Sequence, residues 1–160
     1  MPRFLWTQKQ DFGPRPRMGH MMAFDSYRGQ AILFGGCTTG NRQFNDTWEW
    51  DGELWTQVAD MGPAARYFGA GAYDSEHQQT VLFGGMAGEN RVGDTWQWDG
   101  NGWTQISNSG PAARSGHAMA YDSARRRIVL FGGESETGLL GDTWEFDGEE
   151  WTQQENAGPP

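Results

Sequence analysis

The sequence is poor in cysteine: among its 160 residues only Cys37 carries a thiol. A single cysteine excludes a disulfide within the chain, and therefore a small scaffold that is held together by disulfides. The composition fits a reducing compartment. We interpret Cys37 as a small apolar filler directly behind a glycine doublet.

Long apolar runs are missing as well. Hydrophobic residues make up 36% of the chain, and no segment approaches the length that a membrane-spanning helix needs. Residues 1–10 carry a charge at Arg3 but no apolar core of the kind that a secretory signal contains. We therefore expect a soluble, cytoplasmic chain that does not bind a membrane.

Positive charge is scarce. The 12 Lys and Arg residues are outnumbered by 21 Asp and Glu residues, so the formal net charge is −9, and no basic stripe occurs. Nucleic-acid binding rests largely on cationic side chains that replace the counterions of the phosphates. A nucleic acid is therefore not an expected partner.

Helical periodicity is absent too, but the chain repeats itself. Gly-Pro-Ala-Ala-Arg at residues 62–66 recurs at 110–114, and a related segment lies at 13–17. The starting glycines divide the chain with a period of 49 and then 48 residues into three units, residues 13–61, 62–109 and 110–157. Residues 1–12 precede them, and residues 158–160 begin a further repeat or form a tail. A period in this range is typical of proteins whose repeats pack against their neighbours.

Each unit contains four predicted strands, described here for the third unit. Residues 116–121 alternate small or polar with apolar side chains, and residues 127–131 form an almost continuous apolar run, which predicts a strand buried on both faces. Strands at 142–146 and 150–153 flank an Asp-Gly pair, which favours a tight primed turn. The three units therefore predict twelve strands in three four-stranded antiparallel sheets.

A thirteenth strand is expected at residues 4–8, where Trp-Thr-Gln copies a motif found in every unit. It is an extra copy of an outermost strand, so in a closed ring it competes with residues 150–153 for one position. The N-terminal strand could cross over and close the ring, or the local hairpin could keep the position. The short local connection favours the hairpin, because its loop-closure entropy is smaller.

The glycine doublets at residues 35–36, 84–85 and 132–133 carry a family resemblance. Each doublet follows Leu-Phe and precedes a loop, an aromatic strand and a tryptophan. In this order, over nearly the whole chain, these elements resemble the kelch motif. The resemblance implies an all-β fold, a β-propeller with one four-stranded blade per unit. The gap between Trp50 and Trp55 is shorter than in most kelch repeats, which predicts a tight outer hairpin.

Three blades do not make a closed propeller, which has about 4–8 blades. An open arc would expose the apolar faces of its first and last sheets, and large exposed apolar faces usually mark an interface. The simplest closed arrangement is a two-fold homodimer with six blades. The alternative is that these residues are one part of a longer protein.

One arginine per unit precedes the innermost strand, where the resemblance places the mouth of the central channel: Arg17, Arg66 and Arg114. In a dimer, six guanidinium groups could bind a carboxylate or a phosphate there. We favour a structural interpretation, in which each arginine forms an ion pair between neighbouring blades. The acidic residues that recur with the same period are Asp46, Asp94 and Asp142.

The segments between the second and third strands differ among the units, so ligand specificity could lie in them. They span residues 37–45, 86–93 and 134–141. Their candidate contact residues are Arg42, Asn90, Arg91, Glu134 and Glu136.

No catalytic or metal-binding constellation is evident, and no cofactor is expected. His20 and His117 take the same position in different units and His77 lies in a predicted turn, whereas zinc or copper needs donors that converge on one point. Kelch-like folds include copper radical oxidases, but Cys37 and the tyrosines do not show their arrangement. Ser115 lies near His117 without the glycine-flanked elbow of a nucleophile.

Functions of different classes remain open. We favour a non-catalytic scaffold that self-assembles into a six-bladed dimer and presents loops to a protein or peptide. The second hypothesis is a small-molecule or carbohydrate site in the central channel, with or without catalysis. The third is a half-propeller, natural or engineered, without a function of its own.

Overall fold

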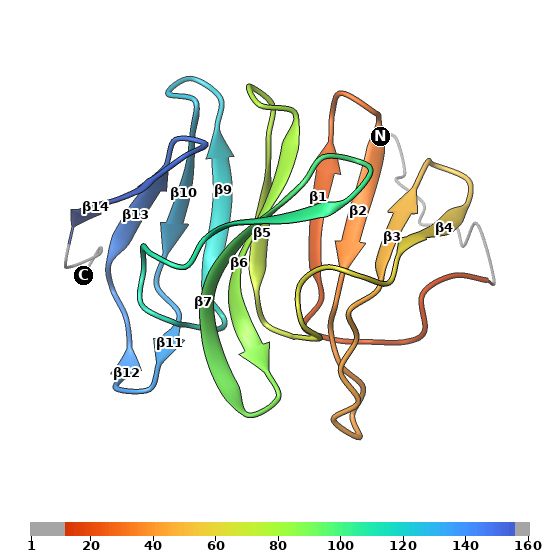
Figure 1. Ribbon diagram of the computed structural model, residues 1–160, viewed down its shortest axis with the longest axis horizontal. Helices are drawn as coiled ribbons and strands as arrows, with labels where there is room; N and C mark the ends of the chain where they lie inside the picture. The colour runs from red at the N-terminus through yellow and green to blue at the C-terminus, as the bar shows by residue number, and fades with distance from the viewer. Residues whose placement is uncertain (1–11, 156–160) are drawn as a thin grey trace, which may run out of the picture.

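The computed structural model describes residues 12–155, and within this range it consists of strands and their connections, with no helix that could span a membrane. Figure 1 shows three four-stranded antiparallel sheets arranged like a fan, which we call blades 1, 2 and 3. Blade 1 contains β1 (Met21–Asp25), β2 (Gln30–Phe34), β3 (Thr47–Trp50) and β4 (Trp55–Ala59). Blade 2 contains β5 (Ala70–Asp74), β6 (Gln79–Ala87), β7 (Asn90–Trp98) and β8 (Trp103–Ser107). Blade 3 contains β9 (Ala118–Asp122), β10 (Arg127–Phe131), β13 (Thr143–Phe146) and β14 (Trp151–Glu155).

The segments between the second and third strands are more regular than expected in two of the three blades. In blade 2 the strands β6 and β7 continue through this segment as a hairpin, with Met86 paired to Arg91. In blade 3 the short strands β11 (Glu134–Ser135) and β12 (Gly138–Leu139) form a small separate hairpin. Figure 1 places all three segments at one end of the fan, which we call the loop end.

The opposite end, which we call the turn end, contains the β1–β2, β5–β6 and β9–β10 turns (Figure 1). Each of these turns begins with an aspartate. Asp25 Oδ1 accepts hydrogen bonds from the backbone N–H groups of Tyr27, at 3.0 Å, and Arg28, at 2.9 Å. The aspartate side chain therefore satisfies backbone donors that the turn leaves unpaired.

The prediction of a two-residue Asp-Gly turn in the outer hairpin is wrong. Trp50 pairs with Trp55, which leaves the four residues 51–54 in the connection. Asp51 Oδ1 accepts from the N–H groups of Glu53 and Leu54, each at 2.8 Å, and Gly52 has a φ of 103°. The longer connection forms because the carboxylate binds these two N–H groups, while glycine tolerates the positive φ.

The blades pack face to face around their first strands, since β5 lies between β1 and β9. Between blades 1 and 2 the buried residues Met21, Phe34 and Leu82 form one core cluster. Between blades 2 and 3 a second cluster contains Ala72, Val81, Ile128 and Phe146. The hydrophobic core thus lies at the junctions between blades, so each repeat depends on its neighbour to bury its apolar side chains.

Strand β14 takes the outermost position of its own blade by pairing with β13, as the local-hairpin alternative predicts. The expected strand at residues 4–8 lies outside the described residues. The prediction that the strand at residues 127–131 is buried on both faces is wrong, because Phe131 is 39% exposed and Val129 is only partly buried. No fourth blade follows blade 3 among the described residues, so one face of β10 is uncovered.

Candidate functional site

A tryptophan from each following blade anchors the two internal junctions. Trp103 of blade 2 donates its indole N–H to Thr47 Oγ1 of blade 1 over 2.8 Å, and its ring lies 5.1 Å from that of Phe34. Trp151 of blade 3 repeats this contact with Thr95, at 3.0 Å, and with Phe83, at 5.3 Å. An aromatic ring with a satisfied polar end can be fully buried, so it suits a tightly packed junction.

Backbone hydrogen bonds at the loop end connect the same junctions. Gly36 N donates to the carbonyl oxygen of Arg66 at 2.8 Å, and Arg66 N donates to Phe44 O at 3.2 Å. The second junction repeats the pair with Gly85, Arg114 and Val92, at 2.8 and 3.3 Å. The first position of the doublets in blades 1 and 2 is glycine partly because the next linker approaches this closely: a Cβ at Gly35 would lie 2.6 Å from Arg66 O, and one at Gly84 would lie 2.7 Å from Arg114 O.

The side chain of the same arginine turns back into its own blade. Arg66 forms a bidentate pair with Asp94, with Nη1–Oδ1 at 2.6 Å and Nη2–Oδ2 at 2.9 Å. Arg66 also donates to the carbonyl oxygens of Ala64 and Gly84. Equivalent pairs join Arg17 to Asp46 and Arg114 to Asp142.

The expected arginine–aspartate pairs are therefore confirmed, but their placement between blades is wrong: each pair lies within one repeat, and the arginine backbone makes the link between blades. The side chains of the three arginines are 3%, 2% and 0% exposed. Their N–H donors are directed at the aspartate and at carbonyl oxygens of the fold. This geometry argues against the hypothesis that the guanidinium groups form a ring that binds an anion.

The electrostatics fit a structural role for these aspartates. For Asp94, burial acts to raise the pKa, but hydrogen bonds from Arg66 and Trp96 outweigh it, and the net pKa is lowered. The pKa of Asp142 is lowered chiefly by its hydrogen bond from Arg114. The carboxylates therefore stay ionised where the arginines need them.

The outward faces of blades 1 and 3 carry apolar side chains that no sheet covers within residues 12–155. Phe34 and Phe83, which lie at an equivalent position of blades 1 and 2, are 1% and 0% exposed, whereas Phe131 of blade 3 is 39% exposed. On the outward face of blade 1, Met22 and Phe24 are 49% and 60% exposed. Figure 1 shows no sheet beyond blade 1 or blade 3 within residues 12–155.

A cavity of about 570 Å³ lies against the open face of blade 3. Ala118 and Phe131 line it from the blade, and Phe68 lines it from the linker before β5. Phe68 has a φ of 55°, although glycine occupies the equivalent positions 19 and 116. This cavity is the space into which a following blade would pack, if blade 3 had a neighbour as blades 1 and 2 do.

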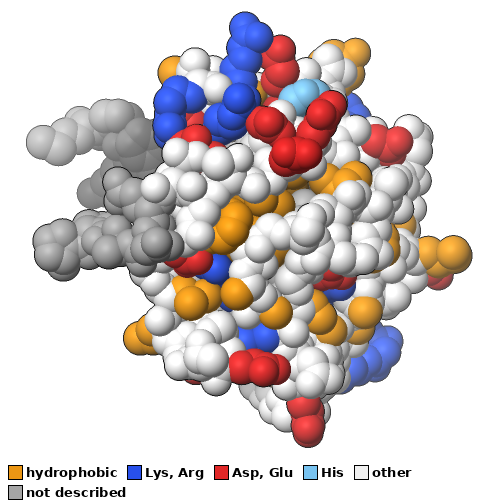
Figure 2. Space-filling view, turned by 60° about the vertical axis from the view of Figure 1, so that its left-hand side comes forward, with side chains coloured by type: hydrophobic (Ala, Val, Ile, Leu, Met, Phe, Trp, Pro, Cys, Tyr) orange, Lys and Arg blue, Asp and Glu red, His pale blue; other side chains and the backbone are white. Residues whose placement is uncertain are grey.

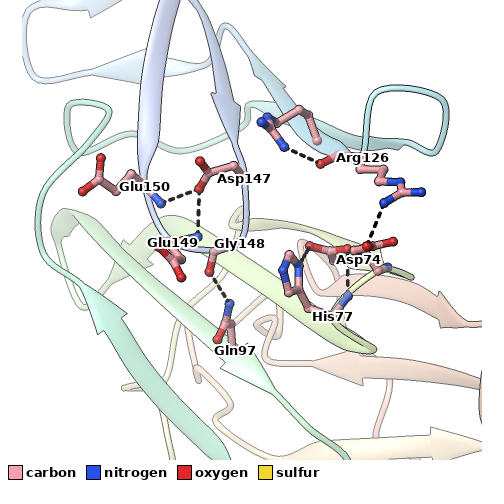
Figure 3. Close-up of polar contacts among 10 residues, drawn as sticks. Asp74, His77, Gln97, Arg126, Asp147, Gly148, Glu149 and Glu150 are labelled. Atoms are coloured by element: carbon pink, nitrogen blue, oxygen red, sulfur yellow. Dashed lines mark hydrogen bonds and ion pairs between the residues drawn. The ribbon is translucent and has the colours of Figure 1, made fainter.

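Charged side chains gather at the turn end. Figure 2 shows Arg, Asp, Glu and His side chains crowded at the top of the molecule, with hydrophobic side chains visible in a hollow below them. Arg126 pairs with Glu76 at 3.0 Å, and His77 Nδ1 lies 2.7 Å from Asp74 Oδ2 (Figure 3). The side chain of His77 is 44% exposed, as expected for a turn residue at the surface.

The turn end also connects blades 2 and 3 by hydrogen bonds. Gln97 Nε2 donates to the carbonyl oxygen of Gly148 over 3.2 Å, as Figure 3 shows. The pair of Arg126 with Glu76 crosses the same junction. These polar contacts hold the turns of blades 2 and 3 together.

The loop end contains the candidate contact residues. Arg42, Asn90 and Glu136 are exposed, and the Arg42 guanidinium lies 5.6 Å from the ring of Phe44. Arg91 and Glu134 are brought together in an ion pair of 2.7 Å that links blade 2 to blade 3. Their pairing gives them a structural role that the sequence analysis did not predict.

His117 packs at the junction of blades 2 and 3, where its ring centroid lies 5.6 Å from that of Phe83. Burial, with a smaller effect from Arg114, lowers the pKa of His117 to about 4. Cys37 is a free, buried thiol, as the sequence analysis predicted. In the part of the chain that the structure describes, no three His, Cys, Asp or Glu side chains are grouped to hold a metal ion.

One repeated position gave no recognisable signal in the sequence, and Gln43, Arg91 and Leu139 occupy it. Gln43 and Arg91 directly precede Phe44 and Val92, whose carbonyl oxygens accept a hydrogen bond from the linker of the following blade. Leu139 precedes Leu140, which is the equivalent residue of blade 3. Gln43 exchanges two hydrogen bonds with the backbone of Gly88, and Arg91 pairs with Glu134, so both reach the following blade. Aligning the repeats on Asp46, Asp94 and Asp142 would have shown the equivalence, since each of the three residues lies three positions before its aspartate, but not the direction of the side chains.

Three four-stranded blades with glycine doublets and anchoring tryptophans, stacked around their first strands, define a run of kelch-type propeller blades. The sequence pattern of the KLHDC2/KLHL20/DRC7 Kelch-repeats domain matches residues 3–160, so the chain belongs to this kelch-repeat family.

Known proteins support the fold in the same way. The structure of YjhT is similar with a TM-score of 0.73 at 12% sequence identity, over 94% of this chain and 48% of that chain. The chain therefore spans about half the length of this solved structure. No curated protein matches the sequence significantly.

Proposed function

We propose that two copies of the chain close a six-bladed kelch propeller, and that this ring is a non-catalytic scaffold whose loop end binds a protein or a peptide. The exposure of Phe131 carries the proposal, because the same position is fully buried wherever a following blade is present. Blade 3 of each copy would pack on blade 1 of the other, under a two-fold axis.

The other face of the new junction supports this arrangement. Met22 and Phe24 of blade 1 occupy positions that in blade 2 hold Gly71 and Tyr73, which face blade 1. The closing junction would thus bury apolar side chains from both copies. Such an interface resembles the core of a domain, and it buries about 2,000 Å² or more in obligate dimers.

The length of the YjhT chain is consistent with a ring formed by two copies of this chain. Because this chain corresponds to 48% of the YjhT chain, two copies together supply a comparable number of residues. A longer protein that continues beyond these residues is the alternative source of the missing blades. Solution mass distinguishes the two for this chain.

Light scattering of the purified chain tests assembly. We expect a mass of about 36 kDa, twice the 17.9 kDa of one chain. A folded species of 17.9 kDa, with sharp near-ultraviolet circular dichroism from its tryptophans, would contradict the closed ring.

The loop end is the proposed binding surface because three of the candidate contact residues there have exposed side chains. Arg42, Asn90 and Glu136 point away from the blades' cores, whereas Arg17, Arg66 and Arg114 are held by aspartates. Loops placed by a rigid scaffold commonly carry binding residues. Varied loops on repeated blades also allow one fold to recognise a specific partner.

A library of random peptides displayed on phage tests binding. We expect selected peptides to lose affinity by about tenfold or more for Arg42→Ala or Glu136→Ala, as interface residues do when truncated. Arg126→Ala at the turn end is the control and should not alter affinity. Peptides that depend on Arg126 and not on Arg42 would contradict a binding surface at the loop end.

A further inference from the structure

We infer that Leu139 is the residue that joins the two copies at the loop end, by entering an apolar pocket on blade 1 of the second copy. The inference rests on the proposed ring and specifies its closing contact. It follows from what the equivalent residues do at the two internal junctions.

The first internal junction uses Gln43. Its amide donates to Gly88 O at 3.0 Å and accepts from Gly88 N at 2.9 Å, so the side chain binds the backbone of the next blade's loop. Both atoms of the amide are satisfied by one residue of blade 2. The contact is local, polar and directed forward along the chain.

The second internal junction uses Arg91. Its Nη2 lies 2.7 Å from Glu134 Oε2, on the loop of blade 3 that is equivalent to the one containing Gly88. The contact is again directed forward, but here it is an ion pair. The same position therefore makes the loop-end contact at each junction, with a chemistry that fits the residue it meets.

The third residue at this position has no following blade within one chain. Leu139, in β12, is 89% exposed, which makes it the most exposed large hydrophobic residue among those described. Such exposure of an isolated leucine is not unusual in itself. Its meaning comes from its position, because the two equivalent side chains are both engaged.

Blade 1 offers an apolar pocket at the matching place. Pro16, Met18, Cys37 and Thr38 are among the residues that line a cavity of about 430 Å³ there. Cys37 is the counterpart of Glu134, since each directly follows a glycine doublet. Position 139 of a preceding blade would therefore reach this pocket, as Arg91 reaches Glu134.

The backbone beside Leu139 is set up for the same contact. At the internal junctions the linker arginine donates to Phe44 O or Val92 O and accepts from Gly36 N or Gly85 N. The counterparts in blade 3 are Leu140 O and Gly133 N, which would meet the backbone of Arg17 in the second copy. Two backbone hydrogen bonds would thus place Leu139 over the pocket.

Arg91 meets an acidic residue and Leu139 would meet an apolar pocket, and this difference distinguishes the correct order of blades from an incorrect one. Leu139 opposite Glu134 would leave a carboxylate against an apolar side chain, and Arg91 opposite Cys37 would leave a guanidinium without an acid. Mismatched partners of this kind are a common source of specificity. Blade 3 would therefore select blade 1 of a second copy over its other blades.

The decisive experiment measures dimer dissociation by sedimentation for Leu139→Arg, with Leu54→Arg in the exposed outer hairpin as the matched control. We expect the dimer of Leu139→Arg to dissociate at about tenfold or more lower affinity, whereas Leu54→Arg should behave as the wild type. Because Leu139 is exposed in the single chain, its replacement should leave the fold of each blade intact.

A charge-matched variant tests direct contact. Met18 lines the pocket and is 48% exposed, so Met18→Glu should fold. Combined with Leu139→Arg, it should recover at least part of the lost affinity, since the pair would copy the contact of Arg91 with Glu134. Strictly additive losses in the double variant would overturn the contact.

The two proposals fail in different ways. A dimeric wild type whose affinity does not change in Leu139→Arg would overturn the role of Leu139 and leave the ring standing. A monomeric wild type would overturn the ring itself.

Discussion

The indole N–H of Trp151 donates to Thr95 Oγ1 over 3.0 Å across the junction of blades 2 and 3. Thr95 is fully buried, so water cannot take the place of either partner in this hydrogen bond. Replacing Thr95 by valine keeps the shape but leaves a buried donor without an acceptor, which costs about 1–3 kcal/mol of the free energy of unfolding. Chemical denaturation measures the loss.

The control for this change is Thr152→Val in β14. Thr152 is exposed, and valine is well tolerated in strands, so the free energy of unfolding should change by less than about 0.5 kcal/mol. Equal losses in the two variants would show that the junction does not depend on the hydrogen bond.

Arg66→Ala should destabilise the protein strongly. It leaves Asp94 partly buried without its bidentate partner, and breaking a buried pair costs about 3–5 kcal/mol. Arg126→Ala removes an exposed pair with Glu76, which is worth about 1 kcal/mol or less. Thermal unfolding of the two variants should separate clearly, and an unaltered stability of Arg66→Ala would refute the structural role.

Mild acid should weaken the fold through His117. His117 has a pKa of about 4 in the fold against 6.5 in an unfolded chain, so between these values the unfolded state binds more protons. Stability is therefore lost as the pH falls from about 6.5 to 4, by about 3 kcal/mol in total. His117→Asn should flatten the pH dependence of the denaturation midpoint in this window, and an unchanged slope would show that His117 is not buried as a neutral ring.

The first glycine of each doublet gives a prediction that separates folding from assembly. A Cβ at Gly84 would lie 2.7 Å from the carbonyl oxygen of Arg114, whereas the nearest atom at Gly132 is Leu140 O at 3.4 Å. Gly84→Ala should therefore disrupt the chain. Gly132→Ala should cost only the strain of a positive φ, about 1–2 kcal/mol, and leave a folded chain.

In the proposed ring Gly132→Ala would collide with Arg17 of the second copy. We therefore expect Gly132→Ala to shift light-scattering mass from the dimer to the single chain while its circular dichroism stays native. A native dimer of Gly132→Ala would argue against a junction that copies the internal ones.

Much of the fold follows from features that recur at a fixed period. The glycine doublets, the tryptophans and the arginine–aspartate pairs could be predicted because each is dictated by contacts that every blade repeats. The direction of the arginine could not. Arg66 lies between two blades, and whether its side chain or its backbone makes the link depends on the path of the linker over Gly35 and Gly36.

The parts that the sequence did not predict depend on contacts between segments far apart in the chain. The role of Arg91 appears only when Glu134 of the next repeat is placed beside it. The partial exposure of Phe131 depends on what lies beyond the last blade, and no local pattern contains that information. The outer hairpin was misjudged because Asp51 binds two N–H groups in a four-residue connection.

Arg66 belongs to blade 1 through its backbone and to blade 2 through its guanidinium, and Arg114 does the same one blade further on. No blade can therefore come apart without breaking a bond that its neighbour needs. A terminal repeat should therefore not unfold separately on heating or in denaturant, and the chain should unfold in a single cooperative step.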